Sequence, residues 1–240
     1  MIKMERINRV LAIHDISGFG KCSLTVALPV ISACGVETTV MPTAVLSTHT
    51  GGFTGYTYRD LTCDMPAMGE HWKTINIQPD AIYTGFLGSF EQIEIVKKIA
   101  KDFKRDDNLF IADPCMADHG KMYSVFDKSF AQAMTSLCAQ ADIILPNITE
   151  ACFMTGTEYK ETYDEAYIKD LLLKLSKLGA KVSILTGVSF EEGKTGAMGY
   201  ETATGEFSYY CHEKLPRSYH GTGDIFSSTC VGAMMGGKPW

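Results

Sequence analysis

The chain has 240 residues, of which 45% are hydrophobic and 21% are charged, proportions that are ordinary for a soluble globular enzyme. Its formal net charge of −6 argues against a nucleic-acid backbone as a partner. No apolar run approaches membrane-spanning length, and residues 1–6 lack the apolar core of a signal peptide, so we expect no membrane partner. The eight cysteines include no Cys-x-x-Cys pair, which indicates reduced thiols in a cytoplasmic protein.

Short apolar runs that are typical of buried strands alternate with helical segments in the first part of the chain. Residues 10–13 predict a first strand, followed by a glycine-rich loop over 17–23 and a helical apolar segment over 24–34. Residues 38–41 predict a second strand that runs into the hydroxyl-rich segment 42–52. Those hydroxyls either gather at a ligand or satisfy the backbone of their own loop.

The alternation continues to the end of the chain. Residues 81–84 predict a third strand, and the apolar period of residues 89–104 predicts a helix with a capping box made by Ser89 and Gln92. Further along we expect strands over 109–112, 143–145 and 181–185, a helix over 163–178, and a hairpin that turns at Thr204 and Gly205. This order indicates an α/β fold with a mainly parallel sheet covered on both faces, in one domain over residues 1–240.

A glycine-rich stretch near the C-terminus, Gly221-Thr222-Gly223-Asp224, precedes an apolar run that can form a helix. Glycines let successive N–H groups point into one concavity, and a helix N-terminus adds unpaired N–H groups, so the turn is suited to a phosphate. A carboxylate beside an anion hole repels the anion unless it acts on a neighbouring hydroxyl. The stretch therefore predicts phosphoryl transfer to an alcohol, with an ordinary helix start as the alternative.

The Gly20-Lys21 pair invites comparison with a phosphate-binding P-loop, and that comparison fails. A P-loop needs a glycine where Asp15 stands and a serine or threonine where Cys22 stands. We interpret the segment instead as a loop at the carboxyl end of the first strand, where ligands gather in open α/β sheets.

Polar clusters follow other strands as well. Asp113 and Asp118 lie beyond the fourth strand, where they can bind a hydrated Mg²⁺ or lie in a solvated loop with an Asx turn. Asn147 and Glu150 have the spacing of a helix cap, which explains them without a ligand. Because all the clusters lie just after strands, the sequence predicts one composite site.

Taken together, these residues resemble the pyridoxal kinases, the vitamin B6 branch of the ribokinase-like superfamily, from about Arg9 to Gly236. The stretch 221–224 is typical of the whole superfamily. Three further segments narrow the likeness to the B6 branch: Pro42–Thr50, Thr84–Ser89 and 113–123. The resemblance implies a ribokinase-like three-layer α/β/α fold with a mainly parallel central sheet.

The resemblance also implies roles for individual residues. Asp224 would be the catalytic base, beside an anion hole made by Gly221, Thr222 and Gly223. The pyridine substrate would contact Asp15, Thr43, Ala44, Phe86 and Asp224. ATP would contact Asp113, Asn147, Glu150, Thr186, Arg217, Ser218, Tyr219, His220 and Thr222. The metal would be held by Asp118 and Glu150.

The activity so implied is ATP-dependent phosphorylation of the 5′-hydroxymethyl group of pyridoxal, pyridoxine or pyridoxamine, giving pyridoxal 5′-phosphate or its relatives in B6 salvage. ATP and Mg²⁺ are the implied cofactors, a monovalent cation such as K⁺ is left open, and a homodimer is expected. Two alternatives remain, a hydroxymethylpyrimidine kinase of thiamine synthesis and a catalytically silent vitamin- or nucleotide-binding protein.

Three departures from the family pattern stand out. Asp15 stands where many pyridoxal kinases have serine, so the contact with the ring must differ. His220 is shared with hydroxymethylpyrimidine kinases, although those typically have cysteine where Asp224 stands. The sequence ends at Trp240, where we expect relatives to continue with further helices that help to hold the adenine.

Overall fold

The computed structural model describes residues 7–217 and 219–240, and it divides into two compact units. Unit 1 comprises Met1–Leu109 and Tyr219–Trp240, and unit 2 comprises Phe110–Ser218. The expectation of a single domain stays a prediction, because the compactness of each unit does not show whether either folds alone. No helix among the described residues is both long and apolar enough to cross a membrane.

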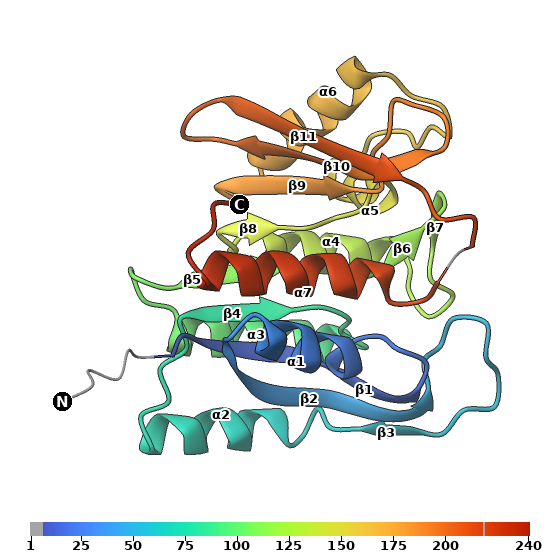
Figure 1. The fold of residues 1–240 in the computed structure, drawn as a ribbon. Coiled ribbons are helices and arrows are strands. Elements are labelled where there is room, and N and C mark those ends of the chain that lie inside the picture. Colours follow the sequence, from blue (N-terminus) through green and yellow to red (C-terminus); the bar gives the residue numbers. More distant parts are fainter. Residues whose placement is uncertain (1–6, 218) are drawn as a thin grey trace. The chain divides into compact units, whose positions relative to one another are not determined.

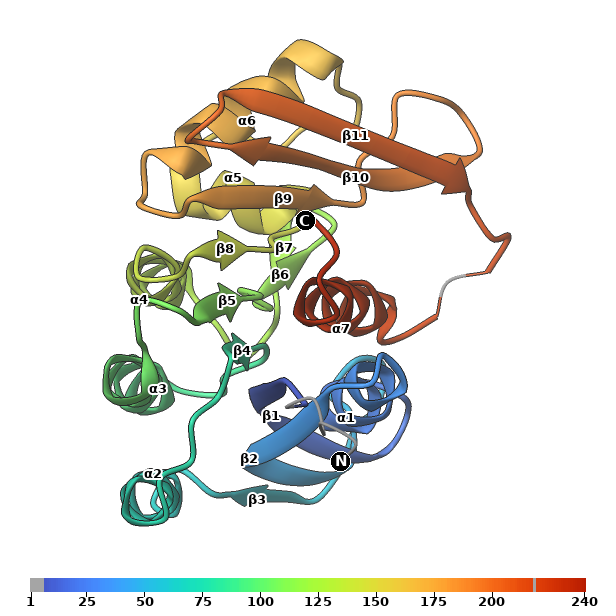
Figure 2. The same ribbon diagram turned by 60° about the vertical axis from the view of Figure 1, so that its left-hand side comes forward.

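Unit 1 is a mainly parallel sheet with helices on both faces. Its elements are β1 (Arg9–Phe19), α1 (Leu24–Ala33), β2 (Glu37–Thr48), β3 (Tyr58–Asp60), α2 (Met65–Thr74), β4 (Ala81–Thr84), α3 (Phe90–Phe103) and α7 (Thr222–Met235) (Figure 1). The strand order is β4-β1-β2-β3, with only β3 antiparallel to its neighbour. Helices α1 and α7 pack side by side on one face, and α2 and α3 lie on the other (Figure 2).

The core of unit 1 forms around two strands whose sequences are short continuous apolar runs. Residues 10–13 of β1 are fully buried, as are residues 81–83 of β4, which pairs with them in parallel. A strand covered by helices on both faces has no solvent side, so its residues do not alternate between apolar and polar. This is why the sequence pattern located both strands.

Unit 2 also has three parallel strands, extended by an antiparallel hairpin. Its elements are β5 (Leu109–Ala112), β6 (Ala117–Asp118), β7 (Lys121–Met122), α4 (Lys128–Cys138), β8 (Ile143–Ile144), α5 (Ile148–Thr155), α6 (Glu165–Ser176), β9 (Val182–Thr186), β10 (Lys194–Glu201) and β11 (Glu206–Glu213). The strand order is β11-β10-β9-β8-β5, and β6 pairs only with β7. Helix α5 packs between α4 and α6, and α6 contacts β9 and β10. The predicted hairpin is confirmed, with longer strands.

The first two strands are longer than the sequence predicted. Strand β1 continues through Phe19, which pairs with Thr48 of β2, so the segments interpreted as loops over 17–19 and 42–48 are strands. Gly18 allows this pairing, since a Cβ there would lie only 3.1 Å from the carbonyl oxygen of Ser47. The prediction was wrong because glycine and hydroxyl residues are typical of loops, whereas here they allow a close approach of two backbones.

The two predicted helix caps have different outcomes. At α5 the capping box is confirmed, with reciprocal side-chain bonds from Asn147 and Glu150. At α3 only half of the box forms, because Ser89 accepts the N–H of Gln92 while the Gln92 amide points elsewhere. That amide accepts from the Gly88 N–H and donates to the carbonyl of Thr43 and the hydroxyl of Thr62. Gln92 is therefore a buried connector between three segments rather than a cap.

Candidate functional site

The glycine-rich stretch of unit 1 forms the start of α7, as the sequence predicted. Gly221 is the N-cap residue and has a left-handed backbone with φ 75°, and Thr222 and Gly223 are exposed in the first turn. A Cβ on Gly221 would overlap the carbonyl oxygen of Lys21, so the start of α7 packs directly on the backbone of the loop before α1. The first N–H groups of a helix have no acceptor within it, and they are available to an anion here.

Asp224 lies in the first turn of the same helix and is half-buried. Burial is the main cause that raises the pKa of its carboxyl from the usual 3.8 to about 6, and the negative charge of Asp15 adds to the increase. The backbone N–H of Ser23 acts in the opposite direction, because it stabilises the charged form. A carboxyl with a pKa near 6 is ionised at neutral pH, yet it is a stronger base than an exposed aspartate.

Three of the residues assigned to the substrate lie at one irregularity in the sheet. The β1–β2 register shifts between His14 and Ile16, so that Asp15 lies opposite Thr43 and Ala44 at the shift. All three are buried. Such irregularities re-aim side chains at functional sites, which accords with the predicted grouping of these residues.

The Asp15 carboxylate is held by two hydroxyl groups. Ser23 donates to Oδ1 over 2.6 Å, and Ser17 donates to Oδ2 over 2.9 Å. Burial raises the pKa of Asp15, while these two hydrogen bonds and the ring of His49 lower it. Each carboxylate oxygen can accept more than one hydrogen bond, so Asp15 can still accept one from a ligand.

Phe86, which the resemblance places near the pyridine ring, lies in the loop after β4 and is half-buried. A Cβ at the neighbouring Gly88 would lie 3.8 Å from the Phe86 ring and 2.9 Å from the hydroxyl of Tyr58. Burial, together with the charges of Asp60 and Asp15, raises the pKa of Tyr58. Tyr58 is thus an aromatic residue near Asp15 that sequence reasoning did not identify.

Two histidines form a ring pair next to the start of α7. The rings of His49, from the segment after β2, and His220 have centroids 4.3 Å apart. Nδ1 of His49 accepts the N–H of Gly51, so a neutral His49 ring has its proton on Nε2. Burial first and the neighbouring His220 second lower the pKa of His49, while the charge of Asp15 raises it.

The other residues assigned to the nucleotide near this stretch are exposed. Tyr219 in unit 1 has 56% of its surface exposed, and Arg217 in unit 2 is also exposed. Ser218 lies outside the described residues. These assignments stay predictions.

Unit 2 contains a second buried carboxylate, Glu150 in the first turn of α5. Its Oε2 accepts the N–H of Asn147 over 2.8 Å, and its Oε1 accepts the N–H groups of Met116 and Ala117 over 3.0 and 3.5 Å. Burial first, and the charge of Asp113 second, raise the pKa of Glu150 to about 8, although the three backbone bonds lower it. The carboxylate thereby ties the segment after β5 to the start of α5.

Asn147 and Thr186 lie together at the ends of their strands. They form an isolated parallel bridge, and the Asn147 amide also donates to the carbonyl of Ala117 over 2.7 Å. Asp118 is exposed in the β6–β7 hairpin, where it accepts the backbone N–H of His119. The structure therefore places Asn147, Glu150 and Thr186 close to the segment after β5, with Asp118 at its solvent side.

Unit 2 has a donor set that suits Mg²⁺. Among residues 7–217 and 219–240, no group of three or more His, Cys, Asp or Glu side chains is arranged to hold a metal ion. Mg²⁺ in phosphoryl-transfer sites, however, needs only one or two carboxylates, with phosphate and water oxygens as the remaining ligands. Burial first and the charge of Asp113 second raise the pKa of Glu150, and a cation bound beside the two groups would favour the charged form of Glu150. The oxygen donors of this unit fit the ion.

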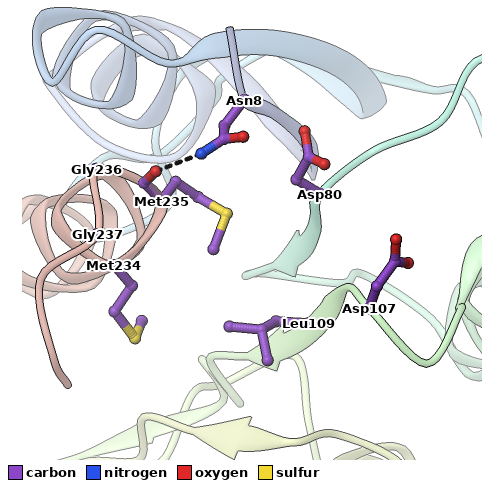
Figure 3. A pocket seen from close by; sticks show the side chains of 8 residues that line it. All are labelled: Asn8, Asp80, Asp107, Leu109, Met234, Met235, Gly236 and Gly237. Carbon is purple, nitrogen blue, oxygen red and sulfur yellow. Dashed lines mark hydrogen bonds between the residues drawn. The ribbon is translucent and has the colours of Figure 1, made fainter. Parts of the chain in front are cut away.

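A surface pocket of unit 1 lies at the opposite end of α7 from Asp224 (Figure 3). Its lining residues, none of which is a predicted site residue, are Asn8, Asp80, Asp107, Leu109 and Met234–Gly237. The amide of Asn8 donates to the carbonyl of Met235 over 2.6 Å. At about 1.5 Å of rise per residue, Met235 is roughly 16 Å along the helix from Asp224, so this pocket is separate from the base.

Sequence reasoning missed Ser17, Ser23, His49 and Tyr58, which surround Asp15 in unit 1. Ser17 and Ser23 were part of a segment interpreted only as a glycine-rich loop. The sequence could have indicated these two serines, because a buried aspartate needs hydrogen-bond donors and Ser17 and Ser23 are the hydroxyl residues nearest to Asp15 in the sequence. Tyr58 gave no comparable signal, because it lies in a short strand whose three residues are all exposed.

Comparison with known proteins places these features in a family of kinases. Residues 26–240 match the family model described as phosphomethylpyrimidine kinase. The fold matches a crystal structure of a candidate phosphomethylpyrimidine kinase from Bacteroides thetaiotaomicron VPI-5482, with a TM-score of 0.94 and 38% identity over 100% of this chain and 82% of that one. A second crystal form of that protein, with pyridoxal, gives a TM-score of 0.92 and 39% identity over 98% of this chain and 82% of that one.

Two further relatives are pyridoxal kinases by description. The crystal structure of pyridoxal kinase from Lactobacillus plantarum has a TM-score of 0.88 and 31% identity over 98% of this chain and 82% of that one. A candidate pyridoxal kinase of Schizosaccharomyces pombe is 29% identical over 80% of this chain, and the match spans only 57% of that relative's length. The structural matches confirm the predicted ribokinase-like α/β fold with mainly parallel strands.

Proposed function

The chain belongs to the phosphomethylpyrimidine kinase family, and we propose that it transfers the γ-phosphoryl group of ATP to the 5′-hydroxymethyl group of pyridoxal, pyridoxine or pyridoxamine. The observation that carries this proposal is Asp224, a half-buried carboxyl with a raised pKa in the first turn of a helix, where the first N–H groups have no acceptor within the helix and suit an anion. A base beside an anion-binding turn suits transfer of phosphate to an alcohol.

In this reaction Asp224 takes the proton of the substrate hydroxyl while the oxygen of that hydroxyl forms a bond to the γ-phosphorus of ATP. The bond between that phosphorus and the bridging oxygen breaks, and ADP leaves with the electron pair. The N–H groups of Thr222 and Gly223 stabilise the charge on the transferred group. General-base help of this kind is typically worth ~10²–10⁴ in rate, and fixed hydrogen-bond donors contribute a similar factor.

Asp15 is proposed to bind the substrate ring through a hydrogen bond to its carboxylate. A protonated pyridine nitrogen or a ring hydroxyl would each donate to this group, and both kinds of bond are charge-assisted. Thr43, Ala44 and Phe86 complete this side of the site. The second crystal form of the Bacteroides relative, which contains pyridoxal, supports a vitamer of this type as the substrate.

Unit 2 is proposed to bind the phosphates of ATP and Mg²⁺. Asp113, Asp118 and Glu150 would hold the ion, which when bound neutralises charge on the phosphate oxygens. Asn147 and Thr186 fix the backbone at the ends of β8 and β9 around these carboxylates. Arg217 of the same unit is proposed to line the nucleotide.

Hydroxymethylpyrimidine kinase is the second candidate, favoured by the name of the matching family model. The resemblance counts against it, because those enzymes typically have cysteine where this chain has Asp224. A catalytically silent binding protein is the third candidate. It is less favoured, since a binding protein has no need of a base whose ionised form is costly to bury.

The resemblance also implies a homodimer, which we propose with the reaction, and it leaves open whether K⁺ or a similar monovalent cation is needed. We place the activity in the cytoplasm, because all eight cysteines of the chain are free thiols.

A phosphorylation assay over pyridoxal, pyridoxine, pyridoxamine and hydroxymethylpyrimidine, with ATP and Mg²⁺, tests the proposal. We expect phosphate transfer to at least one B6 vitamer with a kcat/KM well above that for hydroxymethylpyrimidine. The reverse preference would make the chain a hydroxymethylpyrimidine kinase. ATP turnover with none of the four compounds would leave the binding protein as the better description.

A further inference from the structure

The side chain of Gln92 is fully buried, and it does not make the bond that its position in α3 predicts. Gln92 is the third residue of the helix, where a glutamine usually accepts the N–H of the N-cap residue. Its own N–H donates to the hydroxyl of the N-cap residue Ser89 over 3.2 Å, which fixes where the side chain begins. The amide oxygen, however, accepts the N–H of Gly88 over 2.7 Å, one residue before the cap.

The amide nitrogen of Gln92 reaches two further segments. It donates to the carbonyl oxygen of Thr43 in β2 over 3.1 Å and to the hydroxyl of Thr62, just after β3, over 2.9 Å. Thr62 is itself fixed by Asp60, whose carboxylate accepts both its N–H and its hydroxyl. A glutamine amide has two N–H donors and one oxygen, so all of these groups are used. One side chain thereby joins three segments that are far apart in the sequence.

Two of the joined segments carry residues that are assigned to the ring of the substrate. Thr43 lies opposite Asp15 at the register shift between β1 and β2, and Phe86 lies two residues before Gly88. A Cβ on Gly88 would lie 2.9 Å from the hydroxyl of Tyr58 and 3.8 Å from the Phe86 ring. The loop that carries Phe86 is therefore packed closely against β3, and a small movement of this loop would displace the ring.

We propose that Gln92 is a positioning residue for the vitamer, which holds the Thr43 strand and the Phe86 loop at a fixed separation. This inference rests on the function proposed above. The bonds to Thr43 and Gly88 run through one planar amide, so neither segment can move away without leaving a buried polar group unsatisfied. Gln92 acts through these two segments and needs no contact of its own with the substrate.

Gln92→Met keeps most of the side-chain volume and removes all three side-chain hydrogen bonds. It should raise the KM for each B6 vitamer about 10-fold, because misplacing the groups that orient a substrate by about 1 Å has an effect of this scale or larger. The KM for ATP should stay within about twofold of the parent, since the three joined segments hold no residue assigned to ATP. An unchanged vitamer KM in the folded variant would overturn the proposal.

Thr62→Val is the matched control for a loss of stability. It removes the buried hydroxyl that Gln92 and Asp60 share, and it leaves the bonds from Gln92 to Gly88 and Thr43 in place. Both variants should unfold at a lower temperature than the parent, because each removes hydrogen bonds of the same buried cluster. Only Gln92→Met should raise the vitamer KM. Equal increases in both variants would indicate a general loosening of the fold and would overturn the proposal.

Gln92→Glu tests the donated hydrogen by itself. The introduced carboxyl group still has an acceptor for the N–H of Gly88, and burial raises the pKa of such a group, as it does for Glu150, to about 8. Below its pKa the group holds a proton that it can donate to the Thr43 carbonyl, whereas above its pKa it has no donor. The vitamer KM, divided by that of the parent, should therefore be higher at about pH 9 than at about pH 6. A ratio raised equally at both pH values would overturn the proposal.

Hydrogen exchange makes the test independent of turnover. The N–H of Gly88 should exchange with solvent at least about 10-fold faster in Gln92→Met than in the parent or in Thr62→Val, because its acceptor is gone. If the parent phosphorylates no vitamer while this difference is found, the proposed reaction is wrong and the link made by Gln92 stands. If the parent is active and Gly88 exchanges in Gln92→Met at the parental rate, the positioning role is wrong.

Discussion

Asp224 in unit 1 and Glu150 in unit 2 are both carboxyl groups in the first turn of a helix, with pKa values raised to about 6 and about 8. Their surroundings differ. Glu150 is fully buried and accepts three backbone N–H groups, so its two oxygens join the segment after β5 to the start of α5. Asp224 is half-buried, beside exposed residues of an anion-binding turn. A raised pKa alone therefore does not identify a base, whereas the partners of the carboxyl do.

The largest expected effect is that of Asp224→Asn. The variant keeps the shape of the side chain but cannot accept the proton, so kcat should fall by ~10²–10⁴ while ATP binding persists. In the parent, kcat/KM should rise with pH through about 6, as Asp224 ionises, and then level off. Steady-state kinetics over pH 5 to 9 gives both results. A variant that keeps more than about a tenth of parental kcat would exclude Asp224 as the base.

The same variant should gain stability. The pKa of Asp224 is higher in the folded chain than the usual 3.8, so the folded state binds more protons between about pH 4 and 6 and its stability falls as pH rises through that window. Above pH 6 the ionised carboxyl costs of order 2 kcal/mol, which Asp224→Asn removes. Urea unfolding should therefore show a more stable variant at pH 7 and no difference below about pH 4. A loss of stability at pH 7 would instead mark Asp224 as a helix cap.

Gly221→Ala should have the next largest effect. A Cβ would overlap the carbonyl of Lys21, so the start of α7 must move and its N–H groups lose their alignment. We expect kcat to fall about 10- to 100-fold, since misplacement by about 1 Å has this scale. Gly205→Ala is the matched control, because Gly205 has a similar φ of 72° in the hairpin turn with open space around its Cα. Similar kcat values for the two variants would show that the close packing of Gly221 does not matter for turnover.

Glu150→Gln tests the structural role of Glu150, the second carboxyl group of the comparison. The glutamine amide cannot accept at both ends, so either the N–H of Asn147 or that of Met116 loses its partner, at a cost of about 1–3 kcal/mol in the free energy of unfolding. Thermal unfolding should show this loss, and Glu161→Gln at an exposed position should not. Parental stability would exclude the structural role of Glu150, whereas a raised KM for ATP with Mg²⁺ would follow from the metal role proposed for it.

The smallest expected effect is a change of substrate preference in Asp15→Ser. Serine is the residue that many pyridoxal kinases have at this position, and it replaces a charged acceptor by a neutral one. Relative kcat/KM values among the three vitamers should change severalfold, while the KM for ATP stays close to that of the parent. The comparison needs only initial rates with each vitamer. Unchanged ratios would remove Asp15 from the substrate site.

The sequence predicted the buried centre of each unit better than its edges. The strands β1, β4, β5, β8 and β9 were located because parallel strands covered by helices are continuous apolar runs. Helix α4 was missed although its buried residues, Phe130, Ala131, Met134, Leu137 and Cys138, have a helical period that could have revealed it. The edge strand β3 left no apolar pattern, because all three of its residues are exposed.

The candidate site, like the fold, was predicted from the sequence only in part. The resemblance to the pyridoxal kinases is confirmed by the relatives, and it rested on short motifs that carry backbone geometry, such as Gly221 at a positive φ. The hydroxyl groups around Asp15 could not be assigned in advance, because β1 was expected to end before Ser17. The contacts of these hydroxyl groups depend on the register in which β1 pairs with β2. Because residues 17–23 were interpreted as a loop, no such pairing was expected there. The roles assigned to individual residues stay predictions.

The buried amide of Gln92 has a consequence for how this sequence can diverge. It accepts from the backbone of Gly88 and donates to the backbone of Thr43, and only its third partner, the hydroxyl of Thr62, is a side chain. Backbone partners are present whatever residues occupy their positions. Among related sequences, the residue types at positions 92 and 62 should therefore covary. The residue type at position 43 should vary independently of position 92, so it can change with the substrate.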